Sequence, residues 1–131
     1  MKTLFRSIST ILMFCLAIPQ SLAAFRDISP LDTDIAAYNF VQSQGIMTGS
    51  EDGNFHPTLG LTRCELLKVA LVASHTPLST EANSAFPDIA QNDWCKAYAN
   101  TAKAQTIISG YPDGTFQPNK KVTQIEALKI L

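Results

Sequence analysis

The sequence has no excess of positive charge, because its ten lysine and arginine residues are balanced by eleven aspartate and glutamate residues. Nucleic-acid binding rests mainly on neutralising phosphates with basic side chains, so a chain with a net charge of −1 and no basic stripe is poorly suited to it. Long apolar runs are also lacking. The one apolar run, residues 8–18, is too short to cross a bilayer. These absences argue against a nucleic-acid-binding or membrane-spanning protein.

The apolar run belongs to a segment with the features of a secretory leader. Lys2 and Arg6 give this segment a basic start, and small residues lie three and one positions before Ala24, the pattern that signal peptidase cleaves. We therefore predict a signal peptide over residues 1–23. Loss of the two basic residues changes the net charge from −1 to −3, and no second apolar run follows to hold the chain in a membrane.

Cysteine is scarce, with three residues in the chain, and Cys15 lies within the predicted leader. Cys64 and Cys95 remain. In an oxidising exterior they can pair and join two halves of a small core, or they can remain two small buried thiols. Sequence alone does not give the Cα separation that a disulfide requires, so both interpretations stay open.

The main feature of the sequence is an internal repeat. Residues 25–70 align with residues 86–131 without a gap, at an offset of sixty-one residues, and seventeen of the forty-six aligned positions are identical. A polar linker, residues 74–85, separates the two copies. We therefore predict one repeat over residues 24–73 and a second over residues 86–131, which ends inside its last helix.

Each repeat begins with a pattern for a helix that leads into a tight turn. Asp32 and Asp93 are candidate N-caps of helices of about twelve residues, which end near Gly45 and Thr106. An Asp-Gly dipeptide then favours a tight turn, because glycine adopts positive φ without strain: Asp52-Gly53 and Asp113-Gly114. The same dipeptide occurs in calcium-binding loops, but the ligand positions around it hold unsuitable residues, so we predict no metal site.

The second helix of each repeat has a clear start signal. Thr62 with Glu65, and Thr123 with Glu126, match the capping box, in which hydroxyl and carboxylate each accept from the other residue's amide. Apolar residues at helical spacing then predict the buried face of the first of these helices: Leu66, Val69, Ala70 and Ala73.

Arg63 is not required by either of these signals. It is the first residue of the predicted helix and lies outside both the capping pair and the predicted buried face. Free amides at the positive end of a helix attract carboxylates and phosphates, and a guanidinium beside them strengthens that site. A solvated surface charge is the alternative. The second repeat has Gln124 at this position, so the feature is not duplicated.

Taken together, these motifs resemble those of the S-layer homology (SLH) family. The resemblance covers nearly the whole chain after the leader, and its strength lies in the compound pattern, which recurs at matched spacing. The segments that carry it are residues 25–28, 45–49, 52–57 and 61–65 in the first repeat, and residues 86–89, Trp94, 110–118 and 123–126 in the second.

The resemblance implies a mainly α fold of tandem helix-loop-helix repeats, usually three, around a pseudo-threefold axis. It also implies a secreted protein of the cell wall or S-layer, or of the periplasm or outer surface of a Gram-negative cell. The implied ligand is a cell-wall polysaccharide, either a pyruvylated secondary polymer or a peptidoglycan-associated glycan. No cofactor is implied.

The same resemblance implies which residues bind the glycan. Arg63 corresponds to the arginine of the family's motif, and its planar fork suits a carboxylate. Trp94 corresponds to the family's tryptophan, which offers a stacking surface for a sugar unless it belongs to the core. Gly49 and Gly110 would let the backbone approach the groove.

Three departures from the family pattern limit this transfer. Gln124 replaces the second arginine, so we expect the groove that uses it to bind poorly, and Thr33 stands where a first tryptophan is expected. A third repeat is missing. We expect another segment, a second copy or another SLH-containing chain to complete the assembly, or the chain to be the N-terminal anchor of a larger, truncated envelope protein.

Two other functions compete with glycan binding. In the first, the apolar face of the unfinished second repeat binds a partner protein, and the chain is an assembly module. In the second, His56, His75 and Cys64 form a catalytic set. Nothing in the pattern orients these three residues, and Cys64 lies within a capping box, so we expect no enzyme.

Overall fold

The computed structural model describes residues 25–130, and these residues form four helices. They are α1 (Ile35–Ser43), α2 (Arg63–Ala73), α3 (Cys95–Ala104) and α4 (Gln124–Ile130). Within the described range, the β-type pairing is limited to one isolated antiparallel bridge between Thr62 and Lys121. The predicted mainly α fold is thus confirmed. No helix in this range has the length and apolar character to cross a membrane. The predicted signal peptide, with Cys15, lies outside the described residues.

The two repeats have the same local structure from the first helix to the turn. α1 and α3 each end just before a residue with left-handed backbone, Gly45 at φ 67° and Thr106 at φ 59°. Further on, Gly53 (φ 80°) and Gly114 (φ 82°) each donate the backbone N–H to the carbonyl three residues earlier, at 2.9 Å in both repeats. The Asp-Gly dipeptides therefore close tight turns, as their sequence indicates.

A carboxylate at the start of each repeat fixes the loop that follows the turn. Asp27 accepts hydrogen bonds from the amides of Phe55 and His56 at 2.8 and 2.7 Å. The hydrogen bond from the Phe55 amide is the main cause that lowers the pKa of the Asp27 carboxyl. Asp88 makes the equivalent pair of bonds in the second repeat, at 2.9 and 2.6 Å. In the sequence these aspartates are only two of the identical positions, with no role assigned.

The predicted N-caps of α1 and α3 are wrong in position. The residues that flank these helices are Asp34 and Trp94, and neither caps with its side chain. Asp32 and Asp93 instead accept from the amide two residues on, at 2.9 and 2.8 Å. Each aspartate therefore forms a turn that leads into the helix, and the helices have nine and ten residues, fewer than predicted.

Both second helices begin with a capping box. At α2, the Thr62 amide donates to the Glu65 carboxylate at 2.6 Å and the Glu65 amide to the Thr62 hydroxyl at 3.2 Å. At α4, the corresponding distances between Thr123 and Glu126 are 2.9 and 3.2 Å. These reciprocal bonds satisfy amides that would otherwise lack partners at a helix start.

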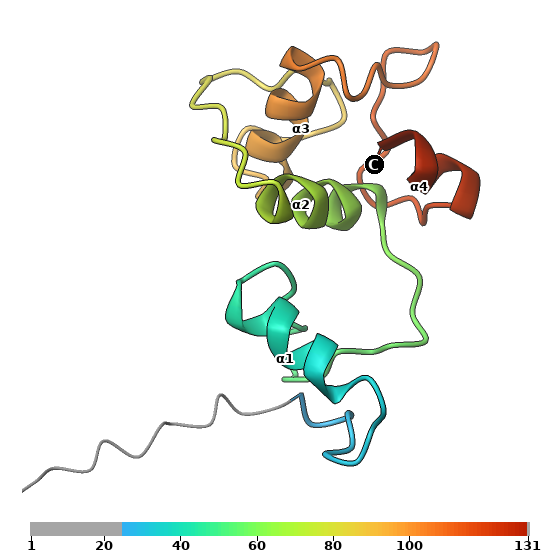
Figure 1. The fold of residues 1–131 in the computed structure, drawn as a ribbon. Coiled ribbons are helices and arrows are strands. Elements are labelled where there is room, and N and C mark those ends of the chain that lie inside the picture. Colours follow the sequence, from blue (N-terminus) through green and yellow to red (C-terminus); the bar gives the residue numbers. More distant parts are fainter. Residues whose placement is uncertain (1–24, 131) are drawn as a thin grey trace, which may run out of the picture.

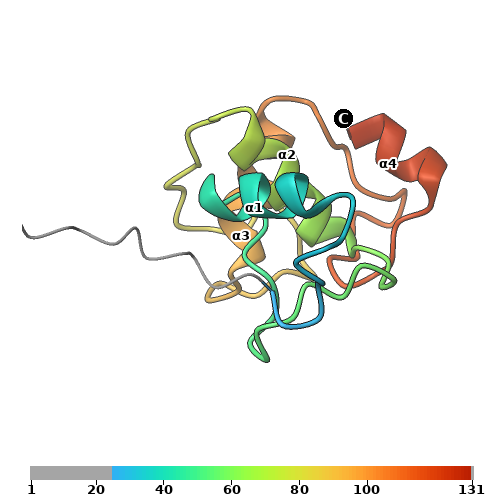
Figure 2. The same cartoon turned by 60° about the horizontal axis from the view of Figure 1, so that its bottom comes forward.

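Helix packing occurs between the repeats and not within them. α2 packs against α3 and against α4, whereas the two helices of one repeat, α1 with α2 and α3 with α4, make no such contact. Figure 1 shows α2 between α1 on one side and α3 with α4 on the other. In the turned view of Figure 2, α1 lies in front of α2. The core therefore forms where the second helix of one repeat meets the next repeat.

The buried face of α2 differs from the predicted one. Leu66 is buried as predicted, but Ala73 is exposed, and the buried positions facing the core are Cys64, Leu67 and Leu71. Eight of the ten residues from 64 to 73 are apolar, so the local pattern permits more than one buried face. The position of α3 decides which face is buried, and the spacing of apolar residues along α2 does not reveal that position.

A disulfide joins the start of α2 to the start of α3. It links Cys64 and Cys95, whose Cα atoms are 5.8 Å apart, and both residues are buried. The linker between the repeats is fixed to α3 as well, because Thr101 accepts from the Ser79 amide at 2.8 Å and Asn100 bonds the backbone of Asn83 and Ala85. The two repeats are thus covalently and non-covalently connected around α2.

Candidate functional site

The start of α2 is bound to the second repeat. The amide of Arg63 donates to the carbonyl of Lys120 at 2.9 Å, and the amide of Cys64 donates to the carbonyl of Pro118 at 3.1 Å. The prediction that free amides here attract an anion is therefore wrong, because a loop of the other repeat supplies the acceptors. The amides of Arg63 and Cys64 therefore both have acceptors within the protein.

The side chain of Arg63 is buried, with an exposed fraction of 7%. Its Nε donates to the Phe116 carbonyl at 2.8 Å. The guanidinium carbon lies 4.8 Å from the centre of the Tyr111 ring and 4.7 Å from that of the Phe116 ring, at distances typical of cation–π contacts. The alternative of a solvated surface charge is wrong. Arg63 is a residue of the first repeat whose environment is built by the second.

An ionic network in the second repeat borders the guanidinium. The Glu126 carboxylate accepts from the Tyr111 hydroxyl at 3.0 Å and from Lys120 Nζ at 3.2 Å, and it lies 3.9 Å from Nη1 of Arg63. Hydrogen bonds from the Thr123 amide, then from Tyr111 and Lys120, lower the pKa of Glu126 to about 2. The same network raises the pKa of Lys120. Glu126 and Lys120 therefore both remain charged at neutral pH.

A groove of about 250 Å³ opens beside this network. Arg63 is its one lining residue from the first repeat, and the others come from the loop before the turn and from α4: Ile107, Ile108, Ser109, Gly110, Tyr111, Glu126, Lys129 and Ile130. Pockets that enclose a whole small molecule measure about 300–1,000 Å³. The groove is therefore smaller than a pocket that encloses a whole small molecule, and Lys129 is a second cation in its lining. We call it the Arg63 groove.

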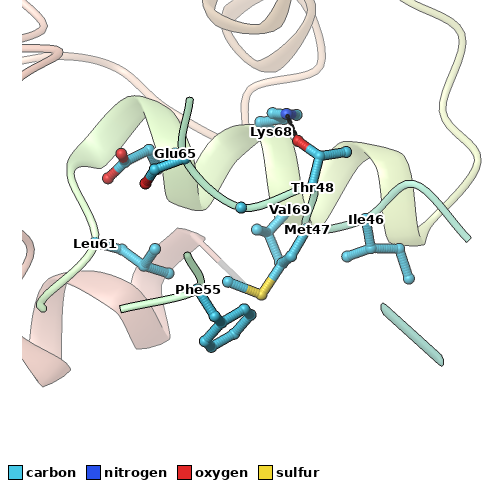
Figure 3. A pocket seen from close by; sticks show the side chains of 10 residues that line it. Ile46, Met47, Thr48, Phe55, Leu61, Glu65, Lys68 and Val69 are labelled. Carbon is cyan, nitrogen blue, oxygen red and sulfur yellow. Dashed lines mark hydrogen bonds between the residues drawn. The ribbon is translucent and has the colours of Figure 1, made fainter. Parts of the chain in front are cut away.

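The first repeat has an equivalent groove, smaller, at about 110 Å³. Figure 3 shows it between the loop at residues 46–48 and α2, with Lys68 Nζ near Thr48 Oγ1, a hydrogen bond of 3.4 Å. Its lining includes the counterparts of most residues of the Arg63 groove. No arginine lines this first groove among the described residues, so its positive charge comes from Lys68 alone.

Gly49 and Gly110 lie in the two grooves, and each leaves room for an aromatic ring of its own repeat. A Cβ atom at Gly110 would lie 2.7 Å from Phe86 Cε1 and 2.8 Å from the Thr115 carbonyl oxygen, closer than atoms can approach. At Gly49 the corresponding distances are again 2.7 and 2.8 Å. Both residues also have positive φ, 75° and 81°. The fold itself therefore requires glycine at these positions.

Trp94 lies apart from both grooves. Its exposed fraction is 54%, which is incompatible with a core position, and its ring meets that of Tyr98 edge-on with centres 6.0 Å apart. Gln124 is exposed at the start of α4. Of the residues considered for catalysis, Cys64 forms the disulfide with Cys95, and His56 Nε2 lies 2.8 Å from the carboxylate of Asp52. The structure therefore brings Arg63 and Gly110 into one groove and leaves Gly49 and Trp94 elsewhere.

Comparison with protein families decides the identity of this architecture. A family model described as the S-layer homology domain matches residues 24–67 and, a second time, residues 85–128. The chain belongs to the S-layer homology domain family. The two matched SLH segments cover well over half of the sequence, and each runs from the start of a repeat into its second helix.

Several bacterial surface proteins are similar to this chain over most of its length. They include a cell surface glycoprotein of Acetivibrio thermocellus, 28% identical over 86% of this chain, and a cellulosome-anchoring protein of the same organism, 27% identical over 85%. A surface layer protein of Brevibacillus choshinensis is 25% identical over 99% of it. The chain spans 5%, 26% and 12% of the length of these three relatives, respectively.

Proposed function

We propose that this SLH chain anchors itself non-covalently to the cell envelope by binding an acidic cell-wall polysaccharide in the Arg63 groove. The cell envelope is where SLH proteins act, and two of the similar proteins are named as surface and anchoring proteins. The observation that carries the proposal is the buried guanidinium of Arg63, held by the second repeat at the wall of a groove that also contains Lys129.

The geometry of the guanidinium suits an anionic ligand. Arginine has five N–H donors, and among residues 25–130 the guanidinium makes one hydrogen bond, from Nε to the Phe116 carbonyl. The rings of Tyr111 and Phe116 and this hydrogen bond fix the plane of the Arg63 guanidinium, so its remaining N–H groups are oriented before a ligand arrives. A carboxylate, such as that of a pyruvyl ketal on a sugar, accepts two such bonds side by side.

The remaining predicted residues have secondary roles in this proposal. Gly110 lines the Arg63 groove and Gly49 the first groove, and each lets an aromatic ring of its own repeat pack closely against the groove loop. Trp94 would stack on a sugar only where the polymer extends beyond the groove, because its half-exposed ring does not line it. The Arg63 groove is therefore the primary binding site, and the first groove binds more weakly.

Sedimentation with purified cell-wall sacculi tests the proposal. Lys129→Gln removes a groove cation from an exposed position, so it should leave the fold intact and reduce the fraction of protein that sediments several-fold. Lys68→Gln is the matched comparison, since Lys68 is the counterpart of Lys129 in the first, more weakly binding groove, and its retention should fall much less than that of Lys129→Gln. Mild acid treatment, which removes ketal-linked pyruvate from the wall, should lower wild-type retention below that of Lys129→Gln on untreated wall, because both Arg63 and Lys129 then lose their anionic partner.

Two results would refute this function. One is equal retention of the wild type, Lys129→Gln and Lys68→Gln. The other is unchanged retention on walls whose acidic groups have been removed, which would transfer the role to a neutral glycan or to a protein of the wall.

A further inference from the structure

The helix contacts of the two repeats suggest an incomplete interface at each end of the described chain. The second helix of the first repeat, α2, packs against the first helix of the following repeat, α3, and a disulfide joins them. If every second helix packs on the first helix of the next repeat, α4 should pack on the first helix of a following repeat. The second helix of a preceding repeat should likewise pack on α1. Among residues 25–130, no helix takes either place.

Burial of equivalent residues identifies the face concerned. Leu67 of α2 corresponds to Leu128 of α4, the same residue type at the same repeat position, and their exposed fractions are 0% and 71%. Cys64 corresponds to Ile125, with exposed fractions of 1% and 71%. α4 therefore presents two large apolar side chains at positions that α2 uses to build the core. Its other face, with Ala127 and Ile130, already packs against that core.

α1 is the helix that would take the place of α3 in this contact. It contains no fully buried residue and packs against no other helix of residues 25–130. Cys95, Ala99 and Ala102 are the core-facing residues of α3, and their counterparts at the start of and along α1 are Asp34, Tyr38 and Val41. Tyr38 and Val41 are only half-buried. A helix like α2 could cover them as α2 covers α3.

The charges of the two ends are complementary. Residues 25–60, which contain α1, carry one basic and five acidic side chains, whereas residues 119–130, which contain α4, carry three basic and one acidic. Opposite net charges steer two such surfaces together and disfavour pairing of like ends. This pattern favours contact between the α4 end of one molecule and the α1 end of another over contact between two α4 ends.

We propose that two copies of this chain associate head-to-tail, with Ile125 and Leu128 of α4 from one copy packed on α1 of the next. The interface repeats the contact between α2 and α3, with Asp34 at the position of Cys95. It is heterologous, so it leaves one free α4 and one free α1 in a dimer and allows further addition. In the assembly, Gln124 of one copy takes the place of Arg63 beside the first groove of the other, so that groove receives an amide in place of a guanidinium.

Sedimentation velocity of the full chain over a range of concentrations tests the association. The sedimentation coefficient should rise with concentration, and the double variant Ile125→Asp/Leu128→Asp should weaken the association about tenfold or more, because it removes two apolar side chains from the contact and places a second carboxylate opposite Asp34. Both residues are exposed in the single chain, so the fold should persist, which circular dichroism checks. Leu78→Asp, in the linker, is the control and should associate as the wild type does. A monomer at all concentrations, or undiminished association of the double variant, would overturn the proposal.

Cysteine cross-linking tests the orientation. The disulfide between Cys64 and Cys95 defines the equivalent pair across the proposed interface as Ile125 and Asp34. Under mild oxidation, a mixture of Ile125→Cys and Asp34→Cys proteins should give a covalent dimer in clear excess over a mixture of Ile125→Cys and Leu78→Cys. A predominant dimer of Ile125→Cys with itself, or equal yields from the two mixtures, would refute head-to-tail packing. Glycan binding by Lys129→Gln is measured separately, so either proposal can fail without the other.

Discussion

Arg63→Ala is the substitution that most clearly separates a residue required by the fold from a surface charge. Arg63 begins the second helix of the first repeat, yet its contacts are with the second repeat: the Phe116 carbonyl, the rings of Tyr111 and Phe116, and the nearby Glu126 carboxylate. Its truncation would leave the Phe116 carbonyl without its donor in a buried position and would leave space between two aromatic rings.

The expected cost follows from these contacts. A hydrogen bond from a charged donor contributes about 1.5–3 kcal/mol, and a partly desolvated cation–π contact about 1–2 kcal/mol. We therefore expect Arg63→Ala to lower the free energy of unfolding by about 3 kcal/mol, with a range of about 2–5 kcal/mol. For a domain of this size, 3 kcal/mol corresponds to a decrease in Tm of about 12–24 °C.

Urea and thermal denaturation followed by circular dichroism measure the effect. Gln124→Ala is the matched control, because Gln124 occupies the same repeat position and is exposed. That control should change the free energy of unfolding by no more than about 0.5 kcal/mol, as surface substitutions usually do. If Arg63→Ala also stays within about 0.5 kcal/mol of the wild type, the guanidinium is not held between the repeats as described.

Three further perturbations test other parts of the account. Replacing Cys64 and Cys95 together by alanine opens a link between residues 31 apart in sequence and should cost about 3.5 kcal/mol; equal urea stability of this variant and the oxidised wild type would contradict it. Because the pKa of Glu126 is about 2, below its ordinary 4.5, its contribution is complete above pH 4.5 and is lost as the pH falls toward 2. Tm should therefore fall over that range, and Glu126→Gln should reduce the fall; an equal fall in both proteins would contradict this role. Gly110→Ala places a Cβ against a packed ring at positive φ and should cost about 2–4 kcal/mol, whereas Gly60→Ala, with open space around its Cβ, should change stability little.

The features that could be predicted from the sequence are those fixed by residues close together in the chain. The capping boxes at Thr62 and Thr123 and the turns at the two Asp-Gly dipeptides depend on partners within three or four residues, and the structure contains all of them. Because the two repeats align at a constant offset, each local feature occurs twice at matched spacing, and this repetition is what made the resemblance to the SLH family specific.

The features that could not be predicted depend on the other repeat. Phe116 and Lys120, which bind the side chain and the amide of Arg63, lie more than fifty residues away in sequence. No local pattern indicates that a charged residue at the start of a helix will be buried between distant aromatic rings. The choice of Leu67 and Leu71 as the buried face of α2 likewise depends on the position of α3.

An NMR titration of the isotope-labelled chain with a soluble, carboxylate-bearing fragment of the wall polymer tests the central claim most directly. We predict that the largest chemical-shift changes occur in the side chain of Arg63 and in residues 107–111 and 126–130, with smaller changes in residues 46–50. Changes confined to residues 46–50, or to the surface around Trp94 with the Arg63 resonances unaffected, would contradict it.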